Sequence, residues 1–565
     1  MGTISDKLMR IINTKEDIRQ ALISKGYDVP TSIPFKEYAK MILDLPCNAD
    51  TFPDIEGIVA RYSASGLTNE QMAANPVWVD KTGNGHDLQL KNFSWKGMSG
   101  IGGYGDENYQ TFYKFTLDDY VFIASPSGVK HMNFTFRVTG LQPGNKLTLA
   151  FFGTTNTVYG IWDKDGIYTV DADIVEAGKP TYFYNGYGAT RGEFTIEILP
   201  LYPGALVFDG VDDYGVCDNF PILTKKKGYT VVALRQWITR GERALGLVSN
   251  VKNWLKDGAF LLEYRNIQAD HLNKPISFGA IGSENDLPHI LTYQTSKSYN
   301  GVSITTGNFE GTDVLHVGKL APTNVGTCIN AAIWELVFLD HDATEEELTK
   351  IKDYFVKTYP WLFPDQAWTV TGKTNEDEDR ATIANITGNG NDLVLSNFGF
   401  AEGSGYNEEG EYAGYLVTDG VDDIASSNTV VYEADFTFIG EWKFIQKDDT
   451  VAGINSASHL YIQNRYNRGA TVMINSTFEN KKNITDYMTF KAITSKGKGY
   501  DENWNEVDLL YGDGNKGTSG VNIGGQGGTE FCHMIFKNMA LYMNKVFTKD
   551  ECIKAYNYLQ TLKSK

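Results

Sequence analysis

TGNGHDLQLKNF, residues Thr82–Phe93, returns almost unchanged as TGNGNDLVLSNF, residues Thr387–Phe398. Both stretches begin with a glycine–asparagine–glycine turn, continue with Asp-Leu and an alternating apolar segment, and close with Asn-Phe. Such a turn before residues that alternate between apolar and polar is typical of a hairpin that leads into a half-buried strand. Two stretches this specific, 305 positions apart, predict two copies of one structural unit.

Further blocks of sequence recur in the same order on both sides of this motif. Upstream, Gly66–Glu70 matches Gly372–Glu376, and downstream Leu206–Asp213 matches Leu416–Asp423. Two more pairs follow: Tyr229–Val232 with Phe436–Ile439, and Thr344–Leu348 with Thr548–Cys552. Blocks that keep one order in both halves indicate a duplication.

The first copy is longer than the second. The TGNG turns lie 305 residues apart but the DGVDD turns only 210, so copy one carries 95 additional residues between them. The copies diverge after Tyr104 and rejoin near Gly204. Within this insertion Phe134, Phe136 and Val138 alternate with polar residues, which is the period of a half-buried strand. The pattern predicts a small β-sandwich placed in a loop of its host.

Each copy closes with a short predicted helix. In the first, Thr344 is the expected N-cap and Glu347 its capping-box partner, after which Leu348, Ile351 and Phe355 recur on one face. Strands closed by such a helix, with LVFDGVDDY before a strand and IWELVFLDHDATEEELTKI at the end, resemble the concanavalin A-like, laminin-G-like jelly roll. The resemblance implies two packed antiparallel sheets in each copy.

The predicted fold class is therefore mainly β: two duplicated concanavalin A-like jelly-roll sandwiches, a small β-sandwich inserted in the first, and a short N-terminal helical segment. The 57 glycines and the 13% aromatic content agree, since they favour β structure rich in turns. The expected domains are a helical anchor at 1–48, a first jelly roll at 49–104 plus 204–363, the inserted β-sandwich at 105–203, and a second jelly roll at 364–565.

Residues 1–48 show apolar side chains at helical spacing, which predicts three short helices. Small helices bury little surface by themselves, so these stripes are expected to dock onto a partner. The first twenty residues alternate charged and apolar groups and are expected to form neither a signal peptide nor a membrane span. The candidate anchor and assembly residues are Ile11, Ile18, Leu22, Phe35, Tyr38 and Ile42.

INTKEDIRQALISKGYDVPTSIPFKEYAKMI, residues 12–42, resembles the N-terminal segment of many virion fibre and tail proteins of phages that infect gut Bacteroidales, including crAss-like phages. Residues 92–115 and 206–237 resemble β domains of the same proteins. The resemblance implies a structural or adhesive virion protein of head, collar or tail. It would be made in the host cytoplasm, displayed on the virion surface, assembled as a trimer, and attached to other virion proteins through its N-terminal helices.

Composition and motifs exclude several kinds of chemistry. A net charge of −19 argues against binding nucleic acid or an anionic membrane through charge. Five widely spaced cysteines predict buried free thiols and not a disulfide framework or zinc site. The nearest string to a glycosidase carboxylate motif, Asp171–Glu176, starts with Asp instead of Glu and falls in the insertion. No catalytic residue and no cofactor are therefore predicted.

Asp209, Asp212 and Asp213 are weak candidates for calcium ligands, as are their counterparts in copy two. Clustered carboxylate oxygens suit this hard cation. However, Asp-Gly turns also need side chains that hydrogen-bond their own backbone. The turn role is the favoured interpretation.

Aromatic rings in polar, loop-like surroundings are candidates for stacking on sugars, although most rings of a β-sandwich fill its core. The candidates are Trp254, Tyr293, Tyr299, Tyr500 and Trp504. We therefore expect a non-enzymatic virion protein that aids attachment to host surface glycans. The alternatives are a capsule-degrading glycosidase and a purely structural decoration protein without a ligand.

Overall fold

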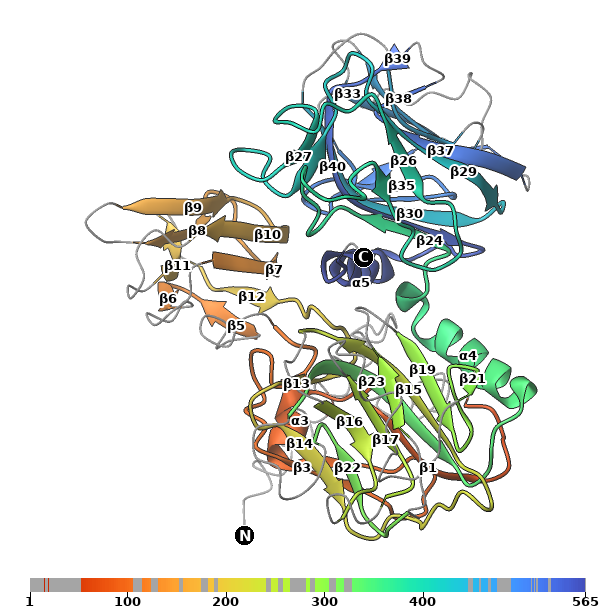
Figure 1. Ribbon diagram of the computed structural model, residues 1–565. Coiled ribbons are helices and arrows are strands. Elements are labelled where there is room, and N and C mark those ends of the chain that lie inside the picture. The colour runs from red at the N-terminus through yellow and green to blue at the C-terminus, as the bar shows by residue number, and fades with distance from the viewer. Residues whose placement is uncertain are drawn as a thin grey trace, which may run out of the picture. The chain divides into compact units, whose positions relative to one another are not determined.

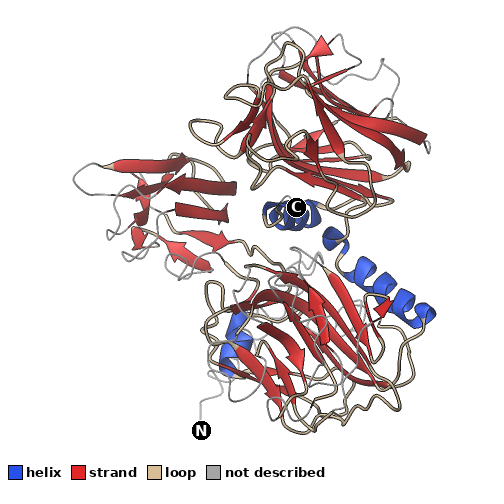
Figure 2. Ribbon diagram, in the orientation of Figure 1, coloured by secondary structure: helices blue, strands red, loops and turns tan. Residues whose placement is uncertain are grey.

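The computed structural model confirms the mainly β fold class, and Figure 2 shows how strands dominate. Of the first 51 residues it describes only Lys15 and Arg19, so the predicted anchor residues Ile11, Ile18, Leu22, Phe35, Tyr38 and Ile42 lie outside the described residues. The other described residues are 52–104, 114–122, 131–151, 156–173, 181–186, 192–239, 245–252, 258–264, 281–284, 290–303, 311–319, 328–445, 451–456, 459–465, 469–474, 489–509, 511, 512, 514, 517–526 and 530–563.

The first sandwich consists of two sheets (Figure 1). Its eight-stranded sheet has the order β21 (Val302–Ser303), β20 (Ser298–Tyr299), β19 (Leu291–Thr295), β15 (Thr230–Trp237), β23 (Asn330–Leu339), β13 (Leu206–Asp209), β4 (Gly100–Ile101), with β1 (Ile58–Ser63) also paired to β23. Its seven-stranded sheet has the order β18 (Ile281–Glu284), β17 (Leu261–Tyr264), β16 (Leu245–Ser249), β22 (Leu315–Val317), β14 (Tyr214–Cys217), β3 (Leu88–Lys91), β2 (Val77–Trp78).

The second sandwich repeats this arrangement strand by strand. Its eight-stranded sheet runs β36 (Glu506–Asp508), β35 (Lys498–Tyr500), β34 (Ala492–Thr494), β30 (Phe436–Phe444), β40 (Met534–Met543), β28 (Tyr415–Val417), β27 (Gly405–Asn407), with β24 (Gln366–Thr369) also paired to β40. Its seven-stranded sheet runs β33 (Gly469–Ile474), β32 (Leu460–Arg465), β31 (Val451–Ser456), β37 (Gly517–Ile523), β29 (Ile424–Tyr432), β26 (Leu393–Ser396), β25 (Thr382–Ile383). A short hairpin, β38 (Gly525–Gln526) with β39 (Glu530–Phe531), stands apart.

The two sandwiches therefore share one strand order, as a duplication requires. One pairing differs: β17 and β18 are parallel, whereas their counterparts β32 and β33 are antiparallel. Each sandwich encloses its own core, since the buried apolar side chains between the sheets form two separate clusters. Two identical strand orders with separate cores are two copies of one folded unit.

The repeated TGNG motif works in the same way in both copies. Leu88 and Leu90 on β3 point into the core while Gln89 and Lys91 are exposed, and β26 shows the same alternation. At the end of each motif Asn92 and Asn397 take positive φ angles of 70° and 69°. Their side-chain amides donate to backbone oxygens in the DGVDD turns, at 3.0 Å and 2.9 Å. The two most similar blocks of sequence are therefore bonded to each other in each sandwich.

The inserted segment between β4 and β13 forms two four-stranded sheets around a core of its own. One sheet has the order β10 (Gly166–Asp173), β7 (His131–Thr139), β12 (Phe194–Ile198), β5 (Lys114–Leu117). The other has the order β6 (Tyr120–Phe122), β11 (Thr181–Gly186), β8 (Lys146–Phe151), β9 (Thr157–Trp162). Phe134, Phe136 and Val138 are buried in this core, in line with their alternation in the sequence.

The helices in the described part of the chain are short. They are α3 (Asn69–Ala74), α4 (Glu345–Thr358), the 3₁₀ turn η1 (Pro360–Leu362) and α5 (Lys549–Gln560). Helix α4 begins directly after Thr344, and α5 begins after Thr548, which forms a capping box with Glu551. No helix among the described residues is both long and apolar enough to cross a membrane.

Candidate functional site

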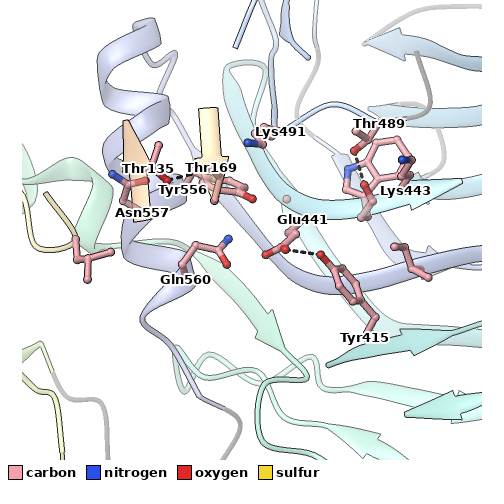
Figure 3. A pocket seen from close by; sticks show the side chains of 14 residues that line it. Thr135, Thr169, Tyr415, Glu441, Lys443, Thr489, Lys491, Tyr556, Asn557 and Gln560 are labelled. Atoms are coloured by element: carbon pink, nitrogen blue, oxygen red, sulfur yellow. Dashed lines mark hydrogen bonds between the residues drawn. The ribbon is translucent and has the colours of Figure 1, made fainter. Parts of the chain in front are cut away.

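A pocket of about 320 Å³ lies against the second sandwich (Figure 3). Eleven of its fourteen lining residues belong to this sandwich or to α5. They are Tyr415, Gly440, Glu441, Trp442, Lys443, Thr489, Lys491, Ile535, Tyr556, Asn557 and Gln560. The volume falls at the lower end of the range of about 300–1,000 Å³ typical of small-molecule sites. We name it the Lys491 pocket.

Glu441 lies on β30, where the strand alternates between core and pocket. Trp442 and Phe444 point into the core, so Glu441 and Lys443 project from the opposite face. The carboxylate of Glu441 accepts a hydrogen bond of 2.6 Å from the Tyr415 hydroxyl, and the Lys537 ammonium lies 3.7 Å from it. Glu441 is therefore a positioned acceptor at the wall of the pocket.

A buried asparagine connects Glu441 on β30 to helix α5. The Asn538 side-chain amide donates to Glu441 Oε2 at 3.4 Å and to Gln560 Oε1 at 3.3 Å. Gln560 Nε2 then has no hydrogen-bond partner among the described residues. Figure 3 shows Gln560 opposite Glu441. The pocket wall thus carries an unused donor close to a carboxylate.

Lys491 brings an ammonium group into the pocket beside two aromatic rings. Its Nζ lies 4.9 Å from the ring centre of Tyr556 and 5.7 Å from that of Trp504. Among the described residues, no acceptor lies within hydrogen-bond distance of this Nζ. Burial lowers the pKa of Lys491 to about 8, against the opposing effect of nearby carboxylates, of which Glu441 acts most strongly. The ammonium therefore contacts two ring faces and is attracted by nearby carboxylates, but it forms no hydrogen bond among the described residues.

Burial corrects the prediction that Tyr500 and Trp504 stack on a sugar. Tyr500 is only 3% exposed and Trp504 only 1%. Trp504 packs edge-on against Tyr556, with ring centres 5.5 Å apart. A ring that is covered on both faces offers no platform to a ligand. These two residues support the pocket from behind.

The other predicted glycan contacts belong to the first sandwich. Tyr293 on β19 and Tyr299 on β20 are partly exposed, and Tyr299 also packs against the core. Trp254 lies outside the described residues. A sugar contact at Tyr293 or Tyr299 stays a prediction, and neither residue lines the Lys491 pocket.

The aspartates of the DGVDD turn accept hydrogen bonds from backbone amides of the same turn. Carboxylate oxygens of Asp209, Asp212 and Asp213 lie within 4.8 Å of one another. Asp209 Oδ1 accepts from the amide of Val211 at 2.8 Å, and Asp213 Oδ2 accepts from the amide of Asp209 at 3.1 Å. Asp419 and its neighbours repeat both bonds. These hydrogen bonds are the ones expected if the aspartates stabilise their own turn, which is the interpretation that the sequence favours.

The Asp213 carboxyl is fully buried and also accepts from the Ser99 hydroxyl at 3.1 Å. Burial, followed by the charge of Asp209, raises the pKa of this carboxyl to about 8. Both of its oxygens accept hydrogen bonds within the fold, as the turn role requires.

The residues of the Lys491 pocket were not predicted from the sequence as binding residues. Their signal was a charged residue inside an apolar stretch of sequence: Glu441 in FIGEWKF and Lys491 in TFKAI. Burying a charge is costly unless it is paired, so such positions are unusual in a core-facing segment. The same pattern also occurs at structural ion pairs, as with Glu335 in IWELV, which contacts Arg61. The signal alone does not separate the two cases.

No known protein family model matches the chain, and no characterised protein matches it in sequence. Similar solved structures include the Trypanosoma rangeli sialidase in complex with sialic acid, with 10% identity, 70% of this chain and 67% of that one covered, and a TM-score of 0.25. An arabinofuranosidase complexed with arabinofuranosyl-alpha-1,2-xylobiose has 8% identity, 66% and 91% coverage, and a TM-score of 0.19.

A further similar structure is that of botulinum neurotoxin type C, a toxin whose cell entry depends upon interaction with two ganglioside molecules. It has 8% identity, 60% of this chain and 90% of that one covered, and a TM-score of 0.22. In two further Trypanosoma rangeli sialidase structures the chain spans about half of the other protein, 48% and 49%. The function of this chain has to be inferred from its own residues, because TM-scores this low carry no inference about activity.

Proposed function

We propose that the chain is a non-enzymatic structural protein that binds carbohydrate in the Lys491 pocket. The observation that carries this proposal is the convergence of Glu441, Gln560 and Lys491 on one concave surface lined by tyrosine rings. A sugar presents hydroxyls that need both donors and acceptors, together with apolar ring faces. A carboxylate accepts, an amide and an ammonium donate, and an aromatic side chain packs against the ring face.

The biological setting is proposed from the resemblance of residues 12–42 to virion fibre and tail proteins. In this setting the protein is a head, collar or tail fibre or spike on the virion surface, and its sandwiches face the host. Residues 1–48 attach it to other virion proteins, and three copies assemble. Deleting residues 1–48 is expected to leave a soluble protein that no longer enters particles. Normal incorporation of the truncated protein would refute this role of the segment.

Glycoside hydrolysis is the second candidate function, favoured by one contact. The 2.6 Å hydrogen bond between Tyr415 and Glu441 pairs a phenol with a carboxylate, and sialidases use a tyrosine nucleophile. Most glycosidases instead need two carboxyl groups about 5–10 Å apart, and Glu441 is the single carboxylate among the lining residues. Binding is therefore favoured over hydrolysis.

The direct test is a glycan array probed with the full chain and with Glu441→Gln. Glu506→Gln is the matched control, because Glu506 is an exposed residue on β36 outside the pocket. We expect the intact chain and the control to bind a common set of glycans and Glu441→Gln to lose them. Absence of binding by the intact chain would overturn the proposed function. Release of reducing ends, lost in Tyr415→Phe, would establish hydrolysis instead.

A further inference from the structure

We propose that the sugar bound in the Lys491 pocket is acidic, and that the Lys491 ammonium binds its anionic group. This inference rests on the proposed function and names the substrate class. Its basis is an ammonium that enters a pocket, contacts two aromatic rings and lacks any hydrogen-bond acceptor among the described residues. A ligand anion would supply the missing partner.

The charges of the lining favour an anion. The lining contains two cations, Lys443 and Lys491, and a single carboxylate, Glu441. Glu441 is already engaged by the Tyr415 hydroxyl and by Lys537. Asp501 and Glu502 also act on Lys491 but do not line the pocket, so the excess of cations is confined to the lining itself.

The surroundings of Lys491 favour binding of an anion over binding of a neutral hydroxyl. Tyr556 and Trp504 displace water from around its ammonium, and the lowered pKa reports this loss of hydration. A hydrogen bond between an ammonium and a carboxylate is roughly twice as strong as a neutral one. Binding of an acidic group therefore compensates the ammonium for the hydration that it lost on burial. A neutral sugar compensates for less of this loss.

The remaining polar groups suit the hydroxyls of the same sugar. Gln560 Nε2 is a donor without a partner among the described residues, and Glu441 lies nearby through their shared contact with Asn538. The exposed Lys443 at the rim can contact a neighbouring acidic unit. Because a carboxylate or a sulfate could supply the charge, both chemistries belong in the test.

The experiment compares acidic oligosaccharides with neutral counterparts of the same sugars. The intact chain is titrated with uronic-acid oligosaccharides, their methyl esters, and sulfated oligosaccharides, and Kd is measured at pH 7. We expect at least one acidic ligand to bind about tenfold or more tightly than its neutral counterpart, as loss of a charge-assisted hydrogen bond predicts. Preference for the uronates or for the sulfated sugars identifies the anion.

Lys491→Met removes the charge but keeps an apolar stem, and Lys491→Arg keeps the charge. We expect Lys491→Met to lose the preference for the acidic ligand and Lys491→Arg to retain part of it. Lys498→Met is the control, because Lys498 is a partly exposed lysine that pairs with Glu506 and Asp508 and does not line the pocket. Thermal unfolding of each variant checks that it is folded, and Lys491→Gln, which also removes the charge, replaces Lys491→Met if that variant is unstable.

Each outcome separates this inference from the proposed function. If methyl esters bind as tightly as the acids, or if variants without a charge at position 491 keep the acidic preference, the inference is wrong although carbohydrate binding stands. If no oligosaccharide of any charge binds the intact chain, the proposed function fails and the inference fails with it.

Discussion

The side-chain amide group of Asn69 makes two hydrogen bonds to the backbone of Ile101: Oδ1 accepts from its N–H at 2.8 Å, and Nδ2 donates to its carbonyl at 3.1 Å. Asn375 forms the same pair of bonds with Tyr406, at 2.9 Å and 2.7 Å. Strands β4 and β27 each end their sheet, so the asparagine takes the place of a missing neighbouring strand. This explains why asparagine recurs in GLTNE and GKTNE.

Replacing Asn69 with alanine is expected to lower the free energy of unfolding of the first sandwich by about 1–3 kcal/mol, the cost of leaving buried backbone groups unpaired. Hydrogen exchange at the Ile101 amide is expected to accelerate. Asn375→Ala is the matched variant, with a smaller loss, because Asn375 is partly exposed whereas Asn69 is buried. Unchanged exchange at Ile101 would contradict this account.

The first sandwich contains a buried ion pair whose two positions are occupied by uncharged residues in the second. Arg61 Nε lies 3.0 Å from Glu335 Oε2, and both side chains are at most 5% exposed. Glu335 also accepts from the hydroxyls of Ser63 and Tyr359, at 3.2 Å and 2.9 Å. The strand registers place Ala367 and Asn538 at the equivalent positions of copy two.

Arg61→Ala is therefore expected to destabilise the first sandwich by about 3–5 kcal/mol, because it leaves a carboxylate buried without its cation. Combining it with Glu335→Asn reproduces the residues of copy two and leaves no unpaired charge. The double variant should lose less than the sum of the two single variants in urea unfolding. Additive losses would show that the two side chains act independently.

His316 on β22 makes the stability of the first sandwich depend on pH. Burial lowers the pKa of His316 to about 4, with Asp218 and Lys319 acting in opposite directions, whereas an unfolded histidine titrates near 6.5. Between these values the unfolded chain binds a proton that the folded chain does not. Stability is therefore expected to fall as the pH falls from about 7 to about 4, by up to about 3 kcal/mol.

The measurement is urea unfolding of the intact chain and of His316→Gln over this pH range. Glutamine does not titrate, so the variant is expected to show a shallower pH dependence. An identical slope in the two proteins would assign the acid sensitivity to other groups.

The inserted β-sandwich should be removable. Its two ends leave the first sandwich side by side, since the Gly102 amide donates to the Ala205 carbonyl and the Tyr202 amide to the Gly102 carbonyl, both at 2.8 Å. In copy two, residues 408–414 join the equivalent strands directly. Replacing 105–199 with a short Gly-Ser linker is expected to leave the first sandwich folded, as judged by its unfolding transition. An insoluble product would place the insertion within the core of its host.

The duplication, the insertion and the β character are readable in the sequence because they depend on local features. Glycine and asparagine mark backbone positions with positive φ, such as Asn92 and Asn397, and strands with one face buried alternate with period two. Thr344 and Thr548 mark helix starts for the same reason, because a hydroxyl before a helix can accept from its first amides. Such features act within a few residues, so a repeat of the pattern predicts a repeat of the structure.

The Lys491 pocket was decided by tertiary structure alone. Eleven of its fourteen lining residues lie between positions 415 and 560, on three strands, a loop and a helix, and only the order of strands in the sheet brings them together. Trp504 shows the same limit, since its polar neighbours in the sequence suggest a surface ring, yet it is 1% exposed beneath Tyr556. Whether a ring or a charge is buried depends on contacts between segments distant in the chain, which no local pattern encodes.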